Sequence, residues 1–251
     1  MKTNRKVIVH PSYRAFEALA ASVPDRFDSE GETLHAGRNT VKRFRTTQAD
    51  WVVKRYKTPN LAQRIAYSFF KKSKAERAYL YAARMQERGI DTPTGIAYIE
   101  EKRGGLLRDS YFISTVCHDK PLYPVLVEAP DYDRTLARQV AAFVATMHQR
   151  GVLHGDTNLN NILYHTDADG QARFTVIDTN RSHFYNTPSQ SVCLHNLKRL
   201  THRRDLLQYI IEEYAALRGW EPTTCVSVVM RALEKFEKRR ALRRRLLKWR
   251  Y

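Results

Sequence analysis

Short runs rich in β-branched and aromatic residues follow one another in the first third of the chain, separated by turn residues. This pattern is typical of consecutive strands, and Gly37 begins the first turn. The predicted strands are 32–36, 40–44 and 50–56. Pro59-Asn60 interrupts the pattern, and 61–70 is predicted to be a helical insert.

A longer helix is predicted after this insert, with Ser73 as its N-cap and Gly89 as its stop. Two further strands, 96–100 and 110–116, flank the turn Gly104-Gly105 and indicate a second hairpin.

Helical periodicity dominates from Asp133 onward. Apolar residues recur there at a spacing of three and four, as on one face of a helix: they are Leu136, Val140, Phe143, Val144 and Met147. Short strands are predicted near 161–164 and 174–177, and helices after 191. We therefore predict an α+β fold of the two-lobed kind, with a β-rich domain at 1–116 and a helical domain at 117–251.

Composition narrows the range of partners. Apolar residues make up 43% of the chain, enough for a core, and the formal net charge of +17 favours a polyanionic partner such as nucleic acid, an anionic membrane or a phosphorylated glycolipid. The apolar stretch near Val7 is too short for a signal peptide, which favours a cytosolic protein. Three distant cysteines suggest neither a disulfide framework nor a zinc site.

Basic residues are densest at the C-terminal end, with ten Lys or Arg and two acids from Arg231 onward. Apolar residues among them recur at helical spacing: Leu233, Phe236, Leu242, Leu246 and Trp249. Such a stripe beside a cationic face is typical of an interfacial amphipathic helix. The alternative is that the stripe packs on the helical domain and the charges are simply solvated.

The strongest chemical signal is His154-Gly155-Asp156, followed by an asparagine at position 161 and apolar residues. The spacing His-x-Asp-x-x-x-x-Asn after a helix and before a short strand is typical of a phosphotransferase catalytic loop. A carboxylate must accept the proton of the attacking hydroxyl, which is the role predicted for Asp156. An amide oxygen five residues later must reach a metal at the phosphates, which is the role predicted for Asn161.

Two charged residues extend this pattern. Asp178 ends the apolar strand near 174–177 and is the second predicted Mg²⁺ ligand. Lys54 lies in the third strand, where its ammonium could neutralise the α- and β-phosphates of a nucleotide. Glu76, in the following helix, is predicted to orient Lys54 through an ion pair.

The segments predicted to bind the nucleotide through their backbone have the least specific sequence pattern of the predicted site. The turn around Gly37 has one glycine where phosphate loops have several, so Arg38 is predicted to supply charge there. The backbone from Thr115 to Cys117 is predicted to bind the adenine.

These residues together resemble the lipopolysaccharide kinase family, the Kdo and heptose kinases of Gram-negative bacteria, within the protein-kinase-like superfamily. The resemblance covers most of the chain, in the segments 37–42, 53–54, 73–79, 89–93, 110–114, 154–163 and 177–181. It implies ATP as the donor and a sugar hydroxyl of the lipopolysaccharide inner core, on Kdo or heptose, as the acceptor. It also implies a cytoplasmic protein, peripheral on the inner face of the cytoplasmic membrane, with an anionic glycolipid as its partner. No nucleic acid is expected, and no stable protein partner can be inferred.

Some residues depart from the pattern of regulated protein kinases. Thr179-Asn180-Arg181 follows the metal-ligand candidate where those enzymes have Phe-Gly, and no Ala-Pro-Glu triplet follows.

The alternative functions are an aminoglycoside- or choline-type small-molecule kinase, an atypical Ser/Thr protein kinase, and a non-catalytic basic module that binds membrane or nucleic acid. The basic residues after position 181 favour an anionic acceptor over a cationic one.

Overall fold

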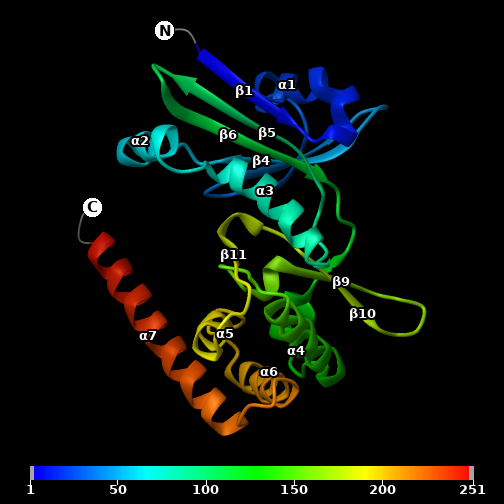
Figure 1. Ribbon diagram of the computed structural model, residues 1–251, viewed down its shortest axis with the longest axis vertical. Coiled ribbons are helices and arrows are strands. Elements are labelled where there is room, and N and C mark those ends of the chain that lie inside the picture. Colours follow the sequence, from blue (N-terminus) through cyan, green and yellow to red (C-terminus); the bar gives the residue numbers. More distant parts are fainter. Residues whose placement is uncertain (1–2, 249–251) are drawn as a thin grey trace. The chain divides into compact units, whose positions relative to one another are not determined.

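A computed structural model describes residues 3–248 of the chain, with side chains to Arg245 (Figure 1). The chain divides into two compact units. The first contains the residues up to His118 together with Val176–Arg181, and the second contains Asp119–Thr175 together with the residues from Ser182 onward.

The first unit is built on a six-stranded sheet in the order β1-β5-β6-β4-β3-β2. Each neighbouring pair is antiparallel. The strands are β1 (Thr3–Val9), β2 (Glu32–Ala36), β3 (Thr40–Arg45), β4 (Asp50–Tyr56), β5 (Gly95–Arg103) and β6 (Leu106–Thr115). Lys54 lies in β4, next to the centre of this sheet, opposite Val41 of β3 and Phe112 of β6.

Residues 3–26 form three elements that the sequence pattern did not reveal. β1 joins the sheet beside β5, and α1 (Glu17–Arg26) follows a short 3-10 helix, η1 (Pro11–Phe16). β1 is largely polar and sits at an edge, so its hydrophobic pattern is weak. Pro24 lies within α1 and masks its helical signal.

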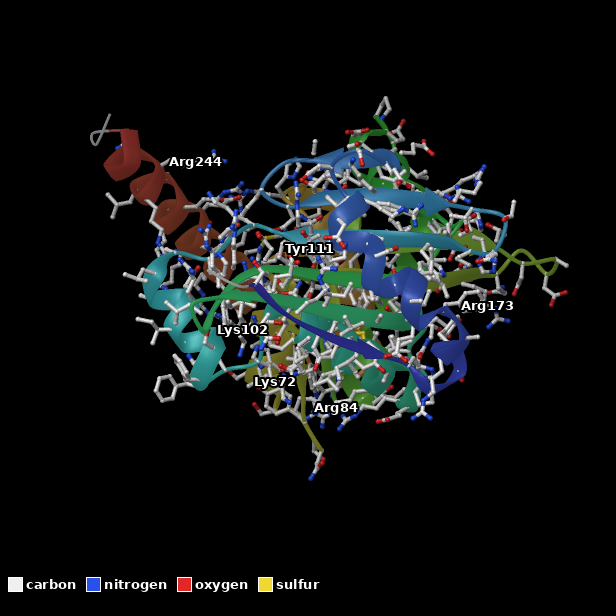
Figure 2. The ribbon with its side chains drawn as sticks, turned by 90° about the horizontal axis from the view of Figure 1, so that it is seen from above. Lys72, Arg84, Lys102, Tyr111, Arg173 and Arg244 are labelled. Atoms are coloured by element: carbon white, nitrogen blue, oxygen red, sulfur yellow. The ribbon has the colours of Figure 1, made fainter. Side chains whose placement is uncertain are left out.

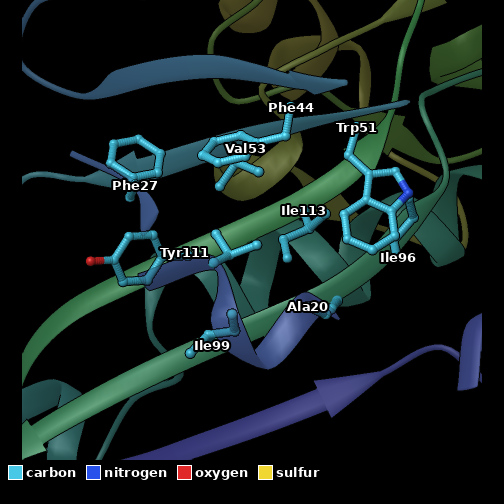
Figure 3. Close-up of a cluster of buried hydrophobic side chains, with 11 residues drawn as sticks. Ala20, Phe27, Phe44, Trp51, Val53, Ile96, Ile99, Tyr111 and Ile113 are labelled. Carbon is cyan, nitrogen blue, oxygen red and sulfur yellow. The ribbon is translucent and has the colours of Figure 1, made fainter. Parts of the chain in front are cut away.

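One face of the sheet packs on α1 through a cluster of large side chains (Figure 3). Phe27, at the end of α1, contacts Phe44 with stacked rings and Tyr111 edge to face. Trp51 and Val53 reach the same cluster from β4. Because side chains alternate along a strand, this arrangement directs Lys54 and Tyr56 to the opposite face.

The opposite face carries α3 (Lys74–Glu87), which buries Ala75, Ala78 and Ala82. The first two of these alanines pack with Tyr56 and Tyr98 of the sheet. Ser73 caps the helix, because its Oγ accepts a hydrogen bond from the backbone N–H of Glu76 at 3.1 Å. The small alanine side chains let α3 lie close to β5 and β6.

The segment 176–181 returns to the first unit and packs on α3. The backbone N–H of Val176 donates to the carbonyl of Asp91 at 2.8 Å. Thr179, in the 3-10 helix η4 (Thr179–Arg181), is buried and its hydroxyl donates to the carbonyl of Ala78 at 3.3 Å. The sequence pattern predicts this segment to lie in the second domain; in the structure, tertiary hydrogen bonds hold it to the first unit.

The second unit is mainly helical. Its helices are α4 (Arg134–Gln149), α5 (Gln190–Leu197), α6 (Arg204–Leu217) and α7 (Pro222–Lys248), with a short π-helix η2 (Pro124–Glu128) and a 3-10 turn η3 (Leu159–Asn161). α6 packs against both α4 and α7. The short strands are β7 (Lys120–Pro121), β8 (Val152–Leu153), β9 (Ile162–Thr166), β10 (Ala172–Val176) and β11 (His183–Phe184).

The predicted fold class is confirmed: an antiparallel β-rich unit comes first and a helical unit follows. The predicted strands, the insert α2 (Leu61–Phe69), the hairpin at Gly104-Gly105 and the cap Ser73 all occur. Over residues 3–248, no helix combines the length and apolar character that crossing a bilayer requires.

Candidate active site

The predicted site residues divide between the two units. The first contains Gly37, Arg38, Lys54, Glu76, Thr115, Cys117 and Asp178, and the second contains Asp156 and Asn161. Each group is described within its own unit.

In the first unit, β4 brings Lys54 to Asp178. Lys54 Nζ lies 2.7 Å from Asp178 Oδ1, and the two side chains are 17% and 29% exposed. The ammonium also lies 5.4 Å from the centre of the Tyr56 ring. These contacts hold a cation and a carboxylate side by side at a place that water still reaches.

The backbone of Asp178 has an unusual conformation. Its φ of 60° is the only positive value for a non-glycine residue among residues 3–248. Asn180 stabilises this turn, because its amide donates to Asp178 Oδ1 and it also hydrogen-bonds with Tyr56. Burial raises the pKa of Tyr56 well above its usual value, so the phenol stays neutral. A left-handed non-glycine residue costs conformational energy and is typical of functional sites.

A set of cations gathers around Asp178. Burial lowers the pKa of Lys74, and the positive charges of Arg38, Arg181 and Arg77 lower it further, while Asp178 opposes them. The Nε of Arg77 is buried and has no hydrogen-bond partner among the described residues. Cations held together against their mutual repulsion favour a polyanionic ligand. Sequence reasoning did not assign a role to Lys74 or Arg77, because nothing in their spacing reveals this convergence.

The predicted ion pair between Lys54 and Glu76 is not formed in this structure. Glu76 instead lies 3.2 Å from Lys72 Nζ, and Lys54 pairs with Asp178. The reason is local: Glu76 is in the first turn of α3 and Lys72 lies directly before the Ser73 cap, so the two side chains are close neighbours. A role for Glu76 in catalysis stays a prediction.

The turn predicted to hold phosphate joins β2 to β3. The Gly37 N–H donates to the carbonyl of Asn39 at 3.2 Å, and the Asn39 side chain accepts from the backbone of Lys57 at 3.1 Å. A Cβ at Gly37 would lie 2.8 Å from His35 Nε2, so a larger residue would displace that ring. Arg38 is exposed on this turn. The phosphate role of Gly37 and Arg38 stays a prediction.

The backbone predicted to bind adenine follows β6. The Thr115 N–H donates to the carbonyl of Thr94, and the Thr115 hydroxyl accepts from the Thr94 N–H, both at 3.0 Å. The amide of Thr115 is therefore occupied by the protein itself. Cys117 is half-buried, and adenine binding there stays a prediction.

In the second unit, the loop after β8 brings together Asp156, Asn161 and Arg199. Asp156 Oδ1 lies 2.6 Å from Arg199 Nη2, and its side chain is 19% exposed. The Asn161 amide donates to the backbone carbonyl of Asp156 at 2.9 Å. The Arg199 guanidinium lies 5.3 Å from the centre of the Phe236 ring of α7. Sequence reasoning placed Arg199 among basic residues without identifying its pairing with Asp156.

A chain of polar side chains, with the buried His148 and Tyr214 at its centre, supports this loop. Arg218 donates to the Tyr214 hydroxyl at 2.8 Å, and Tyr214 lies 2.9 Å from His148 Nδ1. His148 Nε2 lies 3.0 Å from Asn196 Oδ1. An amide oxygen only accepts, so Nε2 carries the proton and Nδ1 accepts from Tyr214.

The same chain ends on the loop backbone. The Asn196 amide donates to the His154 carbonyl at 3.3 Å, and the Thr157 hydroxyl lies 2.6 Å from that carbonyl and 2.7 Å from Asn196 Oδ1. Residues of α4, α5 and α6 thus fix the backbone on both sides of Asp156.

An antiparallel β-rich unit followed by a helical unit with this loop defines the class of kinase-like phosphotransferases. Residues 26–218 match the model of the lipopolysaccharide kinase (Kdo/WaaP) family. The chain belongs to that family, and the protein is a kinase.

Individual relatives agree with this assignment. The chain is 24% identical over 184 residues to a 3-deoxy-D-manno-octulosonic acid kinase of Vibrio cholerae, covering 70% of this chain and 75% of the relative. It is 28% identical over 118 residues to the lipopolysaccharide core heptose(I) kinase WaaP of Escherichia coli, covering 43% and 44%. A solved structure of WaaP in complex with acyl carrier protein matches with a TM-score of 0.62 at 18% identity, over 92% of this chain and 98% of that one, which concerns the fold alone.

The buried His148 should make stability depend on pH. Burial lowers its pKa to about 4, so the native state binds its proton later than the unfolded state does as pH falls. The contribution of His148 to the free energy of unfolding is complete above the pKa of the histidine in the unfolded chain. It is lost as the pH falls toward the pKa of His148 in the folded protein. From these two values we expect a loss of about 2 kcal/mol between about pH 7.5 and about pH 5.

Urea unfolding at both pH values checks this expectation. His148→Gln should show a smaller loss on acidification than the wild type, whereas His183→Gln, at an exposed histidine, should match the wild type. Equal pH sensitivity in the wild type and His148→Gln would contradict the assignment.

Proposed function

We propose that this kinase transfers the γ-phosphoryl group of ATP to a sugar hydroxyl of the lipopolysaccharide inner core, on a Kdo or heptose residue. The observation that carries the proposal is the Lys54–Asp178 pair within a set of cations, in a chain that belongs to the lipopolysaccharide kinase family. The two named relatives act on these two sugars, so the choice between Kdo and heptose is left to the acceptor assay.

The first unit supplies the residues that would hold the triphosphate. Lys54 is fixed by its strand and by Asp178, and Lys74, Arg77 and Arg38 add positive charge around it. The negative charges of a triphosphate would relieve the repulsion among these cations. The same cations would stabilise negative charge on the phosphoryl group during its transfer. Phosphoryl transfer depends mainly on such positioning and charge compensation.

The second unit supplies the proposed general base. The Asp156 carboxylate would accept the proton of the acceptor hydroxyl as that oxygen attacks phosphorus. Arg199 holds one carboxylate oxygen, and Phe236 supports the guanidinium, so the orientation of Asp156 is set before the acceptor binds. The same cation can counter negative charge on the phosphoryl group during transfer.

The donors proposed for Mg²⁺ fit that ion. Asp178 and Asn161 offer a carboxylate and an amide oxygen, which are hard ligands, and Asn161 uses its NH₂ rather than its oxygen to bind the Asp156 carbonyl. Among the described residues there is no cluster of three or more His, Cys, Asp or Glu, and Mg²⁺ typically takes one or two protein oxygens and completes its shell with phosphates and water. When bound, it would neutralise charge on the β- and γ-phosphates.

We also propose that the enzyme is peripheral on the inner face of the cytoplasmic membrane, where a glycolipid acceptor would be held. The structure divides the predicted amphipathic stripe of α7: Leu233 is buried, Phe236 packs on Arg199, and Leu242 is 58% exposed. The side chains of Leu246 and Trp249 lie outside the described residues. The first part of the stripe is therefore structural.

The basic part of α7 supports the membrane proposal better. Six of the eight residues from Lys238 to Arg245 are Lys or Arg, and all eight are exposed. Arg244, labelled in Figure 2, belongs to this stretch.

Asp156→Asn should lower kcat by about 10²- to 10⁴-fold, because an amide cannot accept the proton, while ATP still binds. The assay is transfer of phosphate to inner-core glycolipid acceptors that end in Kdo or in heptose. Asp169→Asn, at an exposed turn in the same unit, is the matched control and should keep wild-type turnover. Near-normal kcat in Asp156→Asn would rule out this base.

Asp178→Asn should remove most of the dependence of ATP affinity on Mg²⁺, because it replaces a charged metal ligand with a neutral one. Calorimetric titration of ATP with and without Mg²⁺ measures this directly. Asp28→Asn is the control, since Asp28 is a mostly exposed carboxylate in the same unit that also pairs with a cation, Arg55. An unchanged Mg²⁺ effect in Asp178→Asn would show that the metal is held elsewhere.

Replacing Arg243, Arg244 and Arg245 together by Gln should weaken binding to anionic vesicles. Each basic residue near such a surface contributes about 1 kcal/mol, so the triple variant should bind roughly a hundredfold less tightly at low salt. Replacing the exposed Arg84, Arg103 and Arg173 by Gln removes the same charge from other surfaces and should have little effect. Equal loss in both triple variants would mean that net charge, and not α7, attracts the protein to the vesicle.

A further inference from the structure

α2 packs on its sheet with the polar side of the helix. The Arg64 guanidinium donates to the carbonyl of Leu107 at 3.0 Å, and the Ser68 hydroxyl accepts from the N–H of the same residue at 2.8 Å. Asn60 caps the helix by accepting from the Gln63 N–H. All nine residues of α2 are described, and each is exposed or half-buried. The helix is therefore fixed in place without a buried apolar face.

Its large apolar side chains point to solvent instead. Leu61 is 63% exposed, Ile65 42%, Phe69 65% and Phe70 79%. The first three are spaced by four residues and share one face of the helix, and the Phe69 and Phe70 rings lie 6.3 Å apart at its end. Globular helices usually turn such a stripe toward the core, and a contiguous exposed patch marks an interaction surface.

The charged residues that flank this stripe in the sequence are all basic. The sequence from Lys57 to Ser73 contains Lys57, Arg64, Lys71 and Lys72 and no acidic residue. Lys57, Lys71 and Lys72 are exposed, and the last of these is 56% exposed and reaches Glu76 at its edge. Figures 1 and 2 show α2 at the rim of the first unit, with Lys72 labelled in Figure 2.

We propose that α2 is an interfacial helix that inserts Leu61, Ile65, Phe69 and Phe70 into the headgroup and acyl boundary of an anionic bilayer. Lys57, Lys71 and Lys72 then lie at the level of the lipid phosphates. An apolar stripe with exposed aromatic residues, bordered by cations, is the pattern of helices that lie in the membrane interface. Arg64 and Ser68 keep the helix anchored to β6, so insertion needs no rearrangement of the sheet.

The inference deepens the proposed function, since a glycolipid acceptor places the enzyme beside a membrane, but its test needs no acceptor. An acidic soluble protein is the other partner that cations and apolar side chains could bind. The observations favour lipid because the four apolar side chains, two of them aromatic, are 42% to 79% exposed on one helix and are accompanied in sequence by exposed lysines, as in helices that lie in the membrane interface.

The experiment is flotation of the full chain with vesicles of phosphatidylethanolamine and phosphatidylglycerol, at low and at high salt. Salt screens the attraction of exposed charges, including those of α7, and leaves apolar insertion in place. At high salt the double variant Phe69→Ser, Phe70→Ser should partition at least about tenfold less than the wild type. Leu217→Ser, at a 52% exposed leucine of α6, is the matched control and should bind like the wild type.

A second measurement reports insertion directly. In Phe70→Trp, the added tryptophan emission should shift to shorter wavelength on anionic vesicles and should be quenched by brominated acyl chains.

Both serine substitutions of the double variant are at exposed positions, so its melting temperature should match that of the wild type.

Three outcomes would overturn the proposal. They are equal high-salt binding by the double variant and the wild type, no high-salt binding by the wild type, and an unquenched Trp at position 70. If the wild type does not bind vesicles at high salt but binds a soluble acidic protein, and the double variant does not bind that protein, α2 is the binding surface for that protein instead. Phosphorylation of a water-soluble, deacylated acceptor should be unchanged in the double variant, so failure of the kinase proposal is seen separately from failure of this one.

Discussion

The ion pair between Lys54 and Asp178 is the constraint around which the first unit is organised. Lys54 comes from a strand near the centre of the sheet and Asp178 from a segment more than a hundred residues later, so their meeting requires the segment 176–181 to dock on α3. The alanines of α3 permit this docking because their small side chains leave room beside the sheet. The left-handed Asp178 is the local cost of placing its carboxylate there.

In the second unit, hydrogen bonds between side chains hold the loop that carries Asp156. This loop places polar side chains, among them His154 and Thr157, at buried positions, where polar groups need hydrogen-bond partners. The chain from Arg218 through Tyr214, His148 and Asn196 joins three helices to that loop. Burial lowers the pKa of His148 and keeps it neutral, and the Asn196 oxygen selects its tautomer, which fixes the direction of each bond.

The positive charge of the chain is distributed between different tasks. One set of cations surrounds Asp178 and suits a triphosphate, while Arg199 pairs with Asp156. Exposed arginines of α7 and lysines beside α2 have no such internal task. The net charge of +17 is thus too coarse a quantity to identify a partner, because it adds charges that lie around Asp178, beside Asp156 and on the outer surface.

Sequence alone determined the kind of elements and the motif from His154 to Asn161. Strand periods, the Ser73 cap and the spacing from His154 to Asn161 are local properties, and local patterns report them well. β1 and α1 were not predicted because an edge strand and a helix with an internal proline have weak hydrophobic periodicity. Only tertiary structure decided that Asp178, and not Glu76, pairs with Lys54, that Arg199 meets Asp156, and that α2 turns its apolar stripe outward. Each of these depends on which segments pack together, and residue spacing along one element does not contain that information.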